Sequence, residues 1–278
     1  MGDFEMAFVD LPSTSTSTST SAVAGTSAAP PLVLIHGFTG HRDDFIGVAP
    51  ILAHNRRVLI PDLRGHGDSE SKPGAYDWSF KQLVQDIEGF LTALDIERCD
   101  LLGHSLGGMV ALRCALSFPE RFRSLALMCT APESPKSLSR EKLIKAADLA
   151  DATGMPRLQE LTEKSGRPNA SRCIRGWGER YWTHNRRRLL AMTPASYRGI
   201  GLELFDAPSQ VARLGEISMP TLVLVGEDDT DFLPGADLFE AHLPNAKRLT
   251  IDRAEHHPHQ ENAEAFLAAM DEHLLRVE

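Results

Sequence analysis

Residues Leu101–Met109 read L-L-G-H-S-L-G-G-M, and the rest of the chain can be understood from this stretch outward. It joins a short apolar run to a Gly-x-Ser-x-Gly motif centred on Ser105. Such a motif is typical of a sharp turn from a buried strand into a helix, which presents the serine at the edge of a sheet. A motif of only five residues also occurs by chance in unrelated sequences. Whether it marks a nucleophile therefore depends on the segments that surround it.

The segments on both sides of the motif alternate between two patterns. Short continuous apolar runs predict strands buried on both faces of a parallel sheet, and a helical period of apolar residues predicts the helices between them. The expected strands are Leu32–Ile35, Arg57–Ile60, Cys99–Leu102, Arg123–Cys129, Pro220–Val225 and Lys247–Ile251. The expected helices are Arg42–His54, Trp78–Leu94, Leu106–Ser117, Leu233–Ala241 and Asn262–Leu275.

This alternation predicts an α/β fold with a doubly wound, mostly parallel sheet. Right-handed crossovers place the carboxyl ends of the parallel strands along one edge, where functional loops gather. The loops expected at that edge are residues 36–40, 62–69, the turn at Ser105 and the segment after Val225.

The alternation stops between about Pro132 and Pro208, where the pattern is largely helical. Residues 134–214 hold 15 Lys and Arg against 8 Asp and Glu, whereas the remainder of the chain holds 14 against 30. Such a shift in charge marks an inserted unit. We therefore expect a core formed by residues 30–132 and 211–278, with a helical cap over 133–210.

The first 29 residues contain the repeat P-S-T-S-T-S-T-S-T-S, which cannot build a core. We expect residues 1–29 to form a disordered or flexible tail, with a short strand over Phe4–Leu11 as the alternative.

Composition excludes several classes of function. A net charge of −9 argues against a general affinity for nucleic acid or an anionic membrane. No apolar run reaches the roughly 18 residues of a membrane span, and the N-terminus lacks the features of a secretory signal. The four cysteines show no metal-binding spacing and suit reduced thiols in a cytoplasmic protein. The expected partner is a small-molecule substrate.

A serine needs an adjacent base, oriented by an acid, before it becomes an effective nucleophile. Downstream of Ser105, V-G-E-D-D-T-D (225–231) ends one predicted strand and A-E-H-H-P (254–258) follows the next. Both segments lie at the edge to which Ser105 projects. The candidate acids are Asp228, Asp229 and Asp231, and the candidate bases are His256 and His257.

With these segments in place, the sequence resembles the α/β-hydrolase superfamily, and within it the capped serine-hydrolase branch of esterases, lactonases, C–C bond hydrolases and cofactor-free haloperoxidases. The matching motifs are H-G-F-T-G (36–40), D-L-R-G-H-G-D-S (62–69), G-H-S-L-G-G (103–108), P-T-L-V-L-V-G-E-D-D (220–229) and H-H-P-H-Q-E-N-A-E-A-F (256–266). They occur in the family's order over about residues 30–275.

The resemblance implies roles for individual residues. The family's acid is the third residue after the glycine that ends its strand, which favours Asp229, and the pattern His-x-Pro-x-x-Glu favours His256 as the base. An oxyanion hole needs two backbone N–H donors. The residue after the nucleophile, Leu106, supplies one, and the resemblance assigns the other to Phe38. No cofactor and no metal are implied.

The chain departs from the family pattern at two places. The Ser/Thr repeat takes the place of a strand hairpin that usually precedes the first buried strand. Glu255 stands where this branch usually has glycine before the histidine, and its carboxylate either raises the pKa of His256 or faces solvent.

The cap carries basic and aromatic residues that allow two interpretations. One is a clamp for an anionic substrate, because guanidinium groups bind carboxylates through two hydrogen bonds. The arginines concerned are Arg172, Arg175, Arg180 and Arg186–Arg188, and the aromatic residues Trp177, Tyr181 and Trp182 pack the cap or line an apolar pocket. To the substrate site we assign Arg172, Arg175, Trp177 and Trp182, together with His104 beside the nucleophile. The other, which we favour for the arginines, is a basic cap docked on an acidic core. A metal site from Asp62, His66 and Asp68 is weaker than a structural role for that turn.

We therefore expect a serine hydrolase that cleaves a small or medium carboxylic ester or lactone through Ser105, His256 and Asp229. Halide-displacing and epoxide-opening relatives are disfavoured, because their elbow nucleophile is an aspartate. One alternative is a C–C bond hydrolase or lyase on a carboxylated substrate. The other is a non-catalytic receptor on the same fold.

Overall fold

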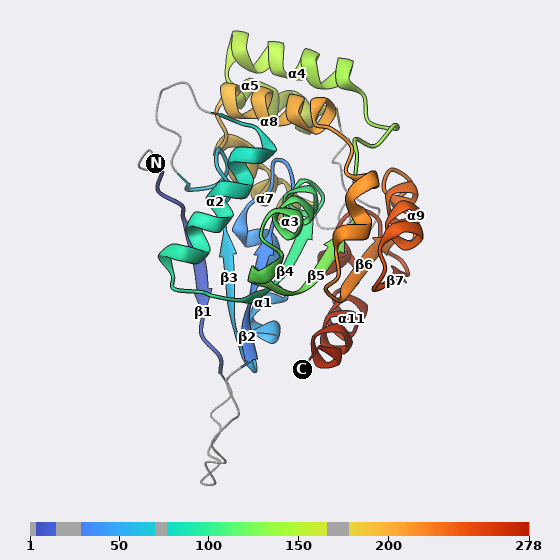
Figure 1. The fold of residues 1–278 in the computed structure, drawn as a ribbon. Coiled ribbons are helices and arrows are strands. Elements are labelled where there is room, and N and C mark those ends of the chain that lie inside the picture. The colour runs from blue at the N-terminus through green and yellow to red at the C-terminus, as the bar shows by residue number, and fades with distance from the viewer. Residues whose placement is uncertain (1–3, 15–28, 70–76, 166–177, 278) are drawn as a thin grey trace.

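The structure is a computed structural model, and it describes residues 4–14, 29–69, 77–165 and 178–277. One seven-stranded sheet organises these residues, in the order β1-β3-β2-β4-β5-β6-β7 (Figure 1). Every neighbouring pair from β3 to β7 is parallel, whereas β1 runs antiparallel to β3. The strands are β1 (Phe8–Leu11), β2 (Ala29–Ile35), β3 (Arg56–Pro61), β4 (Cys99–His104), β5 (Phe122–Met128), β6 (Thr221–Gly226) and β7 (Ala246–Ile251).

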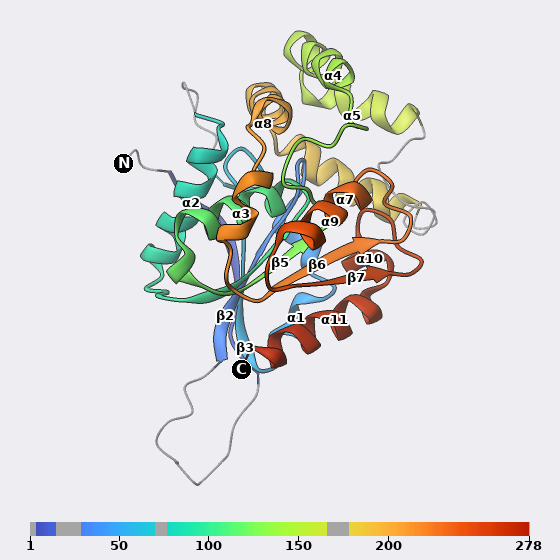
Figure 2. The same ribbon diagram turned by 45° about the vertical axis from the view of Figure 1, so that its right-hand side comes forward.

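Helices cover both faces of the sheet, which confirms the predicted doubly wound architecture. The core helices are α1 (Ala49–Leu52), α2 (Phe80–Ala93), α3 (Leu106–Ser117), α9 (Leu233–His242), α10 (Pro258–Glu261) and α11 (Ala263–Arg276). Short 3-10 turns are η1 (Arg42–Phe45), η2 (Pro119–Arg121) and η3 (Val211–Glu216). Figure 2 shows α2, α3 and α9 on one face and α1 and α11 on the other.

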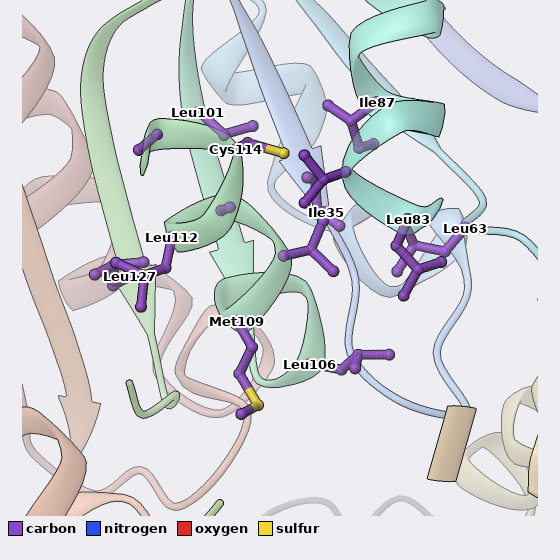
Figure 3. Packing of buried hydrophobic residues seen from close by; sticks show 14 of the residues in the cluster. Ile35, Leu63, Leu83, Ile87, Leu101, Leu106, Met109, Leu112, Cys114 and Leu127 are labelled. Atoms are coloured by element: carbon purple, nitrogen blue, oxygen red, sulfur yellow. The ribbon is translucent and has the colours of Figure 1, made fainter. Parts of the chain in front are cut away.

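The strand period of two divides the apolar residues between two cores. On β2, Val33 and Ile35 face the core under α2 and α3, while Leu32 and Leu34 face the core under α1 and α11. Figure 3 shows the first core, in which Leu112 of α3 lies beside Leu127 of β5. All of these side chains are buried, so α3 is fixed against the sheet at the point where it leaves Ser105.

One predicted helix is wrong. The segment Arg42–His54 forms η1 and the separate four-residue helix α1. Pro50 lies in the first turn of α1 and has no N–H to continue a helix from η1. The apolar period alone did not account for this break.

The start of the chain also differs from the expected tail. Phe8–Leu11 pairs with β3 in the register Phe8↔Pro61 to Leu11↔Val58. Arg57 and Asp10 add an exposed ion pair across these strands, with N···O 2.7 Å. A flexible tail over 1–29 is therefore wrong for Phe8–Leu11, and the alternative of a short strand holds. The repeat itself, residues 15–28, lies outside the described residues.

The described residues of the cap form four helices beyond the carboxyl edge of the sheet: α4 (Arg140–Thr153), α5 (Met155–Lys164), α7 (Glu179–Leu190) and α8 (Pro194–Asp206) (Figures 1 and 2). This confirms the helical cap, and its boundaries at 133 and 210 remain predictions. Within the described ranges, no helix is long and apolar enough to cross a membrane.

Candidate active site

Ser105 sits at the turn between β4 and α3 in a strained backbone conformation, with φ 54° and ψ −119°. A positive φ is uncommon for a residue with a Cβ and persists only where the surroundings enforce it. Two contacts do so here. The Ser105 N–H donates to the carbonyl of Met128 at 2.9 Å, and the Thr130 hydroxyl donates to the carbonyl of Ser105 at 2.7 Å.

The glycines beside Ser105 are required by close approach of backbone segments. A Cβ on Gly103 would lie 2.2 Å from the carbonyl oxygen of Gly107. A Cβ on Gly107 would lie 2.4 Å from the carbonyl oxygens of Ile35 and His36. Real Cβ atoms do not tolerate such distances, so the strand, the turn and the helix pack this tightly only with glycine at both positions.

The imidazole of His256 connects Ser105 to Asp229. Its Nε2 lies 3.0 Å from Ser105 Oγ, and its Nδ1 lies 2.9 Å from Asp229 Oδ2. Because the carboxylate only accepts, Nδ1 carries the proton and Nε2 is free to accept from the serine hydroxyl. The structure thus brings together the serine, the histidine and the aspartate that the sequence selected.

The surroundings of His256 tune its basicity in opposite directions. Burial opposes the charged form, but the nearby carboxylates of Asp229, Glu261 and Asp231 favour it, and the pKa of His256 is raised above its ordinary value of 6.5. The Phe232 ring stacks on the imidazole at 4.7 Å between centroids. Glu261, the last residue of α10, is thus an acid that acts on His256, while Glu255, for which the sequence left two alternatives, lines the cavity.

His104 supports the site without taking part as a base. Its Nε2–H donates to the carbonyl of His256 at 2.7 Å and holds the loop of the base against β4. Burial, followed by the neighbouring His256 and His259, lowers the pKa of His104 well below its usual range, so it is neutral. It also lines the cavity above Ser105.

The two residues predicted to supply the oxyanion hole, Leu106 and Phe38, belong to segments that adjoin Ser105. Leu106 is the first residue of α3, and the first N–H groups of a helix have no partner within it. Phe38 follows Gly37, whose Cβ position would lie only 3.0 Å from Ser105 Cβ. The neighbouring N–H groups of this loop are already paired, since Thr39 donates to His66 Nε2 and Gly40 to the carbonyl of Gly37.

The turn at residues 62–69 acts as a scaffold for that loop. The Asp62 carboxylate accepts from the N–H groups of Arg42 at 2.7 Å and of Asp68 at 3.0 Å. The Arg42 guanidinium also pairs with Asp62 and Asp68, at the place where the sequence allowed a weak metal hypothesis. A cation of the chain itself therefore satisfies these carboxylates.

A cavity of about 510 Å³ opens above Ser105, between the sheet edge and the cap. The cap lines it mainly with apolar and aromatic side chains: Leu138, Leu158, Tyr181, Leu189, Tyr197 and Leu204. Tyr181, Asn185, Arg188 and Leu189 come from one face of α7, at the helical spacing i, i+4, i+7 and i+8. Sequence reasoning named Tyr181 among the aromatic residues of the cap but missed Asn185 and Tyr197, although this spacing was a usable signal for α7.

The cap residues that the sequence predicted to bind substrate do not all lie in the described part of the chain. Arg172, Arg175 and Trp177 lie outside the described residues. Trp182 is described, but it packs edge-on against Tyr181 at 5.0 Å and is not among the cavity-lining residues. Its role in binding substrate therefore stays a prediction.

The cap docks on the core through charge. Arg187 pairs with Asp43 at 2.6 Å, and His184 contacts Asp44 at 2.6 Å. Both acids belong to η1, directly after the Phe38 loop. The favoured interpretation of the basic cap as a surface docked on an acidic core describes these two residues of α7.

The family model of the alpha/beta hydrolase fold matches residues 30–263, and the chain belongs to this family. It is 29% identical to a pimeloyl-[acyl-carrier protein] methyl ester esterase of Nitrosomonas europaea, over 88% of this chain and 96% of that protein. It is 27% identical to a Bacillus subtilis protein named as a candidate 2-succinyl-6-hydroxy-2,4-cyclohexadiene-1-carboxylate synthase, over 91% and 93% of the two chains.

Among solved structures, a thermophilic esterase from Thermogutta terrifontis superposes with a TM-score of 0.78. It is 24% identical, and the match covers 99% of this chain and 94% of that one. The fold and these relatives place the protein among the hydrolases of the alpha/beta fold, with esterases among its relatives at low identity.

Proposed function

We propose that the protein is a serine hydrolase that cleaves a small or medium carboxylic ester or lactone. One observation carries this proposal: the chain Ser105 Oγ, His256 and Asp229, joined by contacts of 3.0 and 2.9 Å, opens into a cavity of about 510 Å³. A serine exposed in this way and backed by a base and an acid is equipped for acyl transfer.

The first half of the reaction follows from the positions of the protons. His256 Nε2 takes the proton of Ser105 as Oγ attacks the substrate carbonyl, and Asp229 stabilises the imidazolium that forms. The N–H groups of Phe38 and Leu106 stabilise the oxyanion, and each such donor contributes about 2.7–4 kcal/mol. The imidazolium then protonates the leaving alcohol, which departs and leaves an acyl-enzyme on Ser105.

The second half reverses these roles with water. His256 removes a proton from a water molecule, which attacks the acyl carbonyl, and returns that proton to Ser105 Oγ as the acid product leaves. The raised pKa of His256 suits this alternation between base and acid. A lactone follows the same steps, except that its alcohol stays attached to the acyl group.

The cavity limits the substrate to small or medium size, and its lining supports an acyl group with an apolar part. Leucines and aromatic rings of the cap face Ser105 from above. The esterase named for Nitrosomonas europaea supports ester cleavage, and the synthase named for Bacillus subtilis keeps the C–C alternative in view. Arg188, which lines the cavity, is the observation that favours a carboxylated substrate for either reaction.

Hydrolysis of p-nitrophenyl esters of graded chain length tests the proposal. Ser105→Ala should lower kcat by about 10⁶-fold, which is loss to background. Ser117→Ala, at the exposed far end of the same helix, serves as the matched control and should retain activity. Undiminished activity of Ser105→Ala would overturn the mechanism. A wild-type enzyme inactive on the whole series would favour the C–C alternative or a receptor.

A further inference from the structure

One buried cation in the catalytic cavity has no role in the mechanism above. Arg188, on α7, is only 8% exposed and lines the cavity of Ser105. It is the only lysine or arginine among the described residues that lines this cavity. Arg188 also lines an adjoining cavity of about 300 Å³, together with Asp44, Tyr181 and His257, which the two cavities share.

The counterion of Arg188 is poorly placed. The nearest carboxylate, Asp44, lies 3.5 Å from one terminal nitrogen, beyond the usual 2.7–3.2 Å for a hydrogen bond of this kind. Asp44 is already bound elsewhere, since its Oδ1 contacts His184 at 2.6 Å and its Oδ2 accepts from the N–H of His41 at 3.0 Å. Arg188 also contacts the hydroxyl of Tyr181, which is neutral because burial raises its pKa.

The guanidinium also has an unused donor. The Nε–H of Arg188 is buried and has no hydrogen-bond partner in the described part of the chain. Burying a cation costs several kcal/mol, and an ion pair offsets this cost only when the geometry is good and the other donors are satisfied. Arg188 meets neither condition, so its burial is not explained by the contacts of the chain alone.

Attachment of the cap does not require Arg188. The close contacts of Arg187 with Asp43 and of His184 with Asp44 already hold α7 on η1. Arg188 differs from Arg187 in the direction of its side chain, which points into the cavity rather than toward the surface of the core. A guanidinium group that borders a cavity and has an unused donor is suited to bind both oxygens of a carboxylate.

We propose that Arg188 determines specificity by binding a carboxylate of the substrate, so that the preferred ester or lactone carries a second, ionised carboxyl group. The proposal rests on the proposed function and names its substrate class. The carboxylate completes the hydrogen bonds of Arg188, including the one from Nε, and the scissile carbonyl lies over Ser105.

The other charges of the cavity favour one orientation of such a substrate. Asp44 lines the cavity next to Arg188, where His184 and the N–H of His41 already bind it. The acids beside the base are Asp229, Asp231 and Glu255, from the loops after β6 and β7. These acids repel a carboxylate from the His256 side, while Arg188 attracts it to the α7 side. A carboxylated substrate is therefore oriented before reaction, which a neutral ester is not.

Matched pairs of esters measure this preference. One series pairs monomethyl esters of dicarboxylic acids of four to eight carbons with methyl esters of monocarboxylic acids of the same length. A second series places the carboxylate in the alcohol, with acetyl esters of hydroxy acids paired with acetyl esters of simple alcohols. We expect the wild type to prefer the charged member in one series, as the ratio of the two kcat/KM values.

Variants at neighbouring positions of α7 test whether the preference for charged esters depends on Arg188. Arg188→Met keeps the length of the side chain, removes its charge and should reduce the ratio by about 10- to 100-fold, the effect of losing charge-assisted hydrogen bonds. Arg188→Lys keeps the charge without the fork and should retain an intermediate ratio. Arg187→Met, outside the cavity, should leave the ratio unchanged.

Binding without turnover gives an independent measurement. Free dicarboxylates should bind to Ser105→Ala in calorimetry more tightly than monocarboxylates of the same length, and Arg188→Lys in that background should weaken the difference. Equal ratios in wild type and both Arg188 variants, or equal binding of the two acid classes, would overturn the proposal. If neutral esters are still cleaved through Ser105, the proposed function stands while this inference fails. Loss of Ser105-dependent cleavage for every ester would instead overturn the proposed function.

Discussion

Replacing Asp229 by asparagine tests the catalytic assignment most directly. Asp229 is 3% exposed, and its Oδ2 lies 2.9 Å from Nδ1 of His256. Asparagine has the same shape, so the fold should persist, but it is neutral and its amide can donate to Nδ1. His256 then carries its proton on Nε2, where it cannot accept the proton of Ser105.

Two estimates of the catalytic free energy lost in Asp229→Asn give similar values. At an effective dielectric constant of about 20, two unit charges 2.9 Å apart attract by about 6 kcal/mol. The corresponding substitution in a Ser-His-Asp triad lowers kcat by about 10⁴-fold, or about 5 kcal/mol. We therefore expect Asp229→Asn to reduce kcat on a p-nitrophenyl ester by about 10⁴-fold, with a much smaller change in KM.

The pH profile adds a second readout. Activity needs neutral His256, whose pKa is raised in the wild type, so kcat/KM falls as the pH drops through a value above 6.5. Asp229→Asn removes the largest influence that raises this pKa and leaves burial, which lowers it. The inflection of the residual activity should therefore move to lower pH.

Asp228→Asn is the matched control, because Asp228 is the second candidate acid and is exposed. Surface substitutions change energies by about 0.5 kcal/mol or less, so kcat should stay within about two-fold. The reasoning is refuted if Asp229→Asn keeps more than about a tenth of the activity. It is also refuted if Asp228→Asn shows the large loss.

Two further predictions concern stability. Burial lowers the pKa of His259 to about 4. As the pH falls, His259 is therefore protonated in the unfolded chain before it is protonated in the folded protein. The free energy of unfolding should decline between about pH 6.5 and 4, by up to about 1.4 kcal/mol per pH unit. His259→Asn should have a shallower decline in urea unfolding, and parallel curves would contradict this. Gly103→Ala should prevent stable folding, because its Cβ would meet the Gly107 carbonyl, whereas Gly89→Ala, with open space inside α2, should stabilise the protein by about 0.5–1 kcal/mol. Thermal unfolding of both glycine variants tests this contrast.

Local sequence patterns were sufficient to predict a strand or helix where a single physical rule determined its structure. Apolar runs such as Leu32–Ile35 predicted strands, because a central parallel strand is buried on both faces. The prediction failed at Arg42–His54, where Pro50 separates two short helical turns. It was left open at Phe8–Leu11, because an exposed edge strand alternates only weakly and is fixed by its pairing with β3.

The sequence alone determined the order of strands and helices, the glycines that permit the turn at Ser105, and the short list of partners for that serine. These follow from local rules: side-chain period, backbone freedom and the chemistry of a nucleophile. Only the tertiary structure decided which side chains share a cavity, because the direction of a residue on a cap helix depends on how that helix packs. It placed Arg188 in the cavity beside a carboxylate already bound by other groups. The motif thus predicted Ser105 as the nucleophile, and the basic cap offered several arginines for an anionic substrate, whereas the choice of Arg188 among them required the position of α7 on the core.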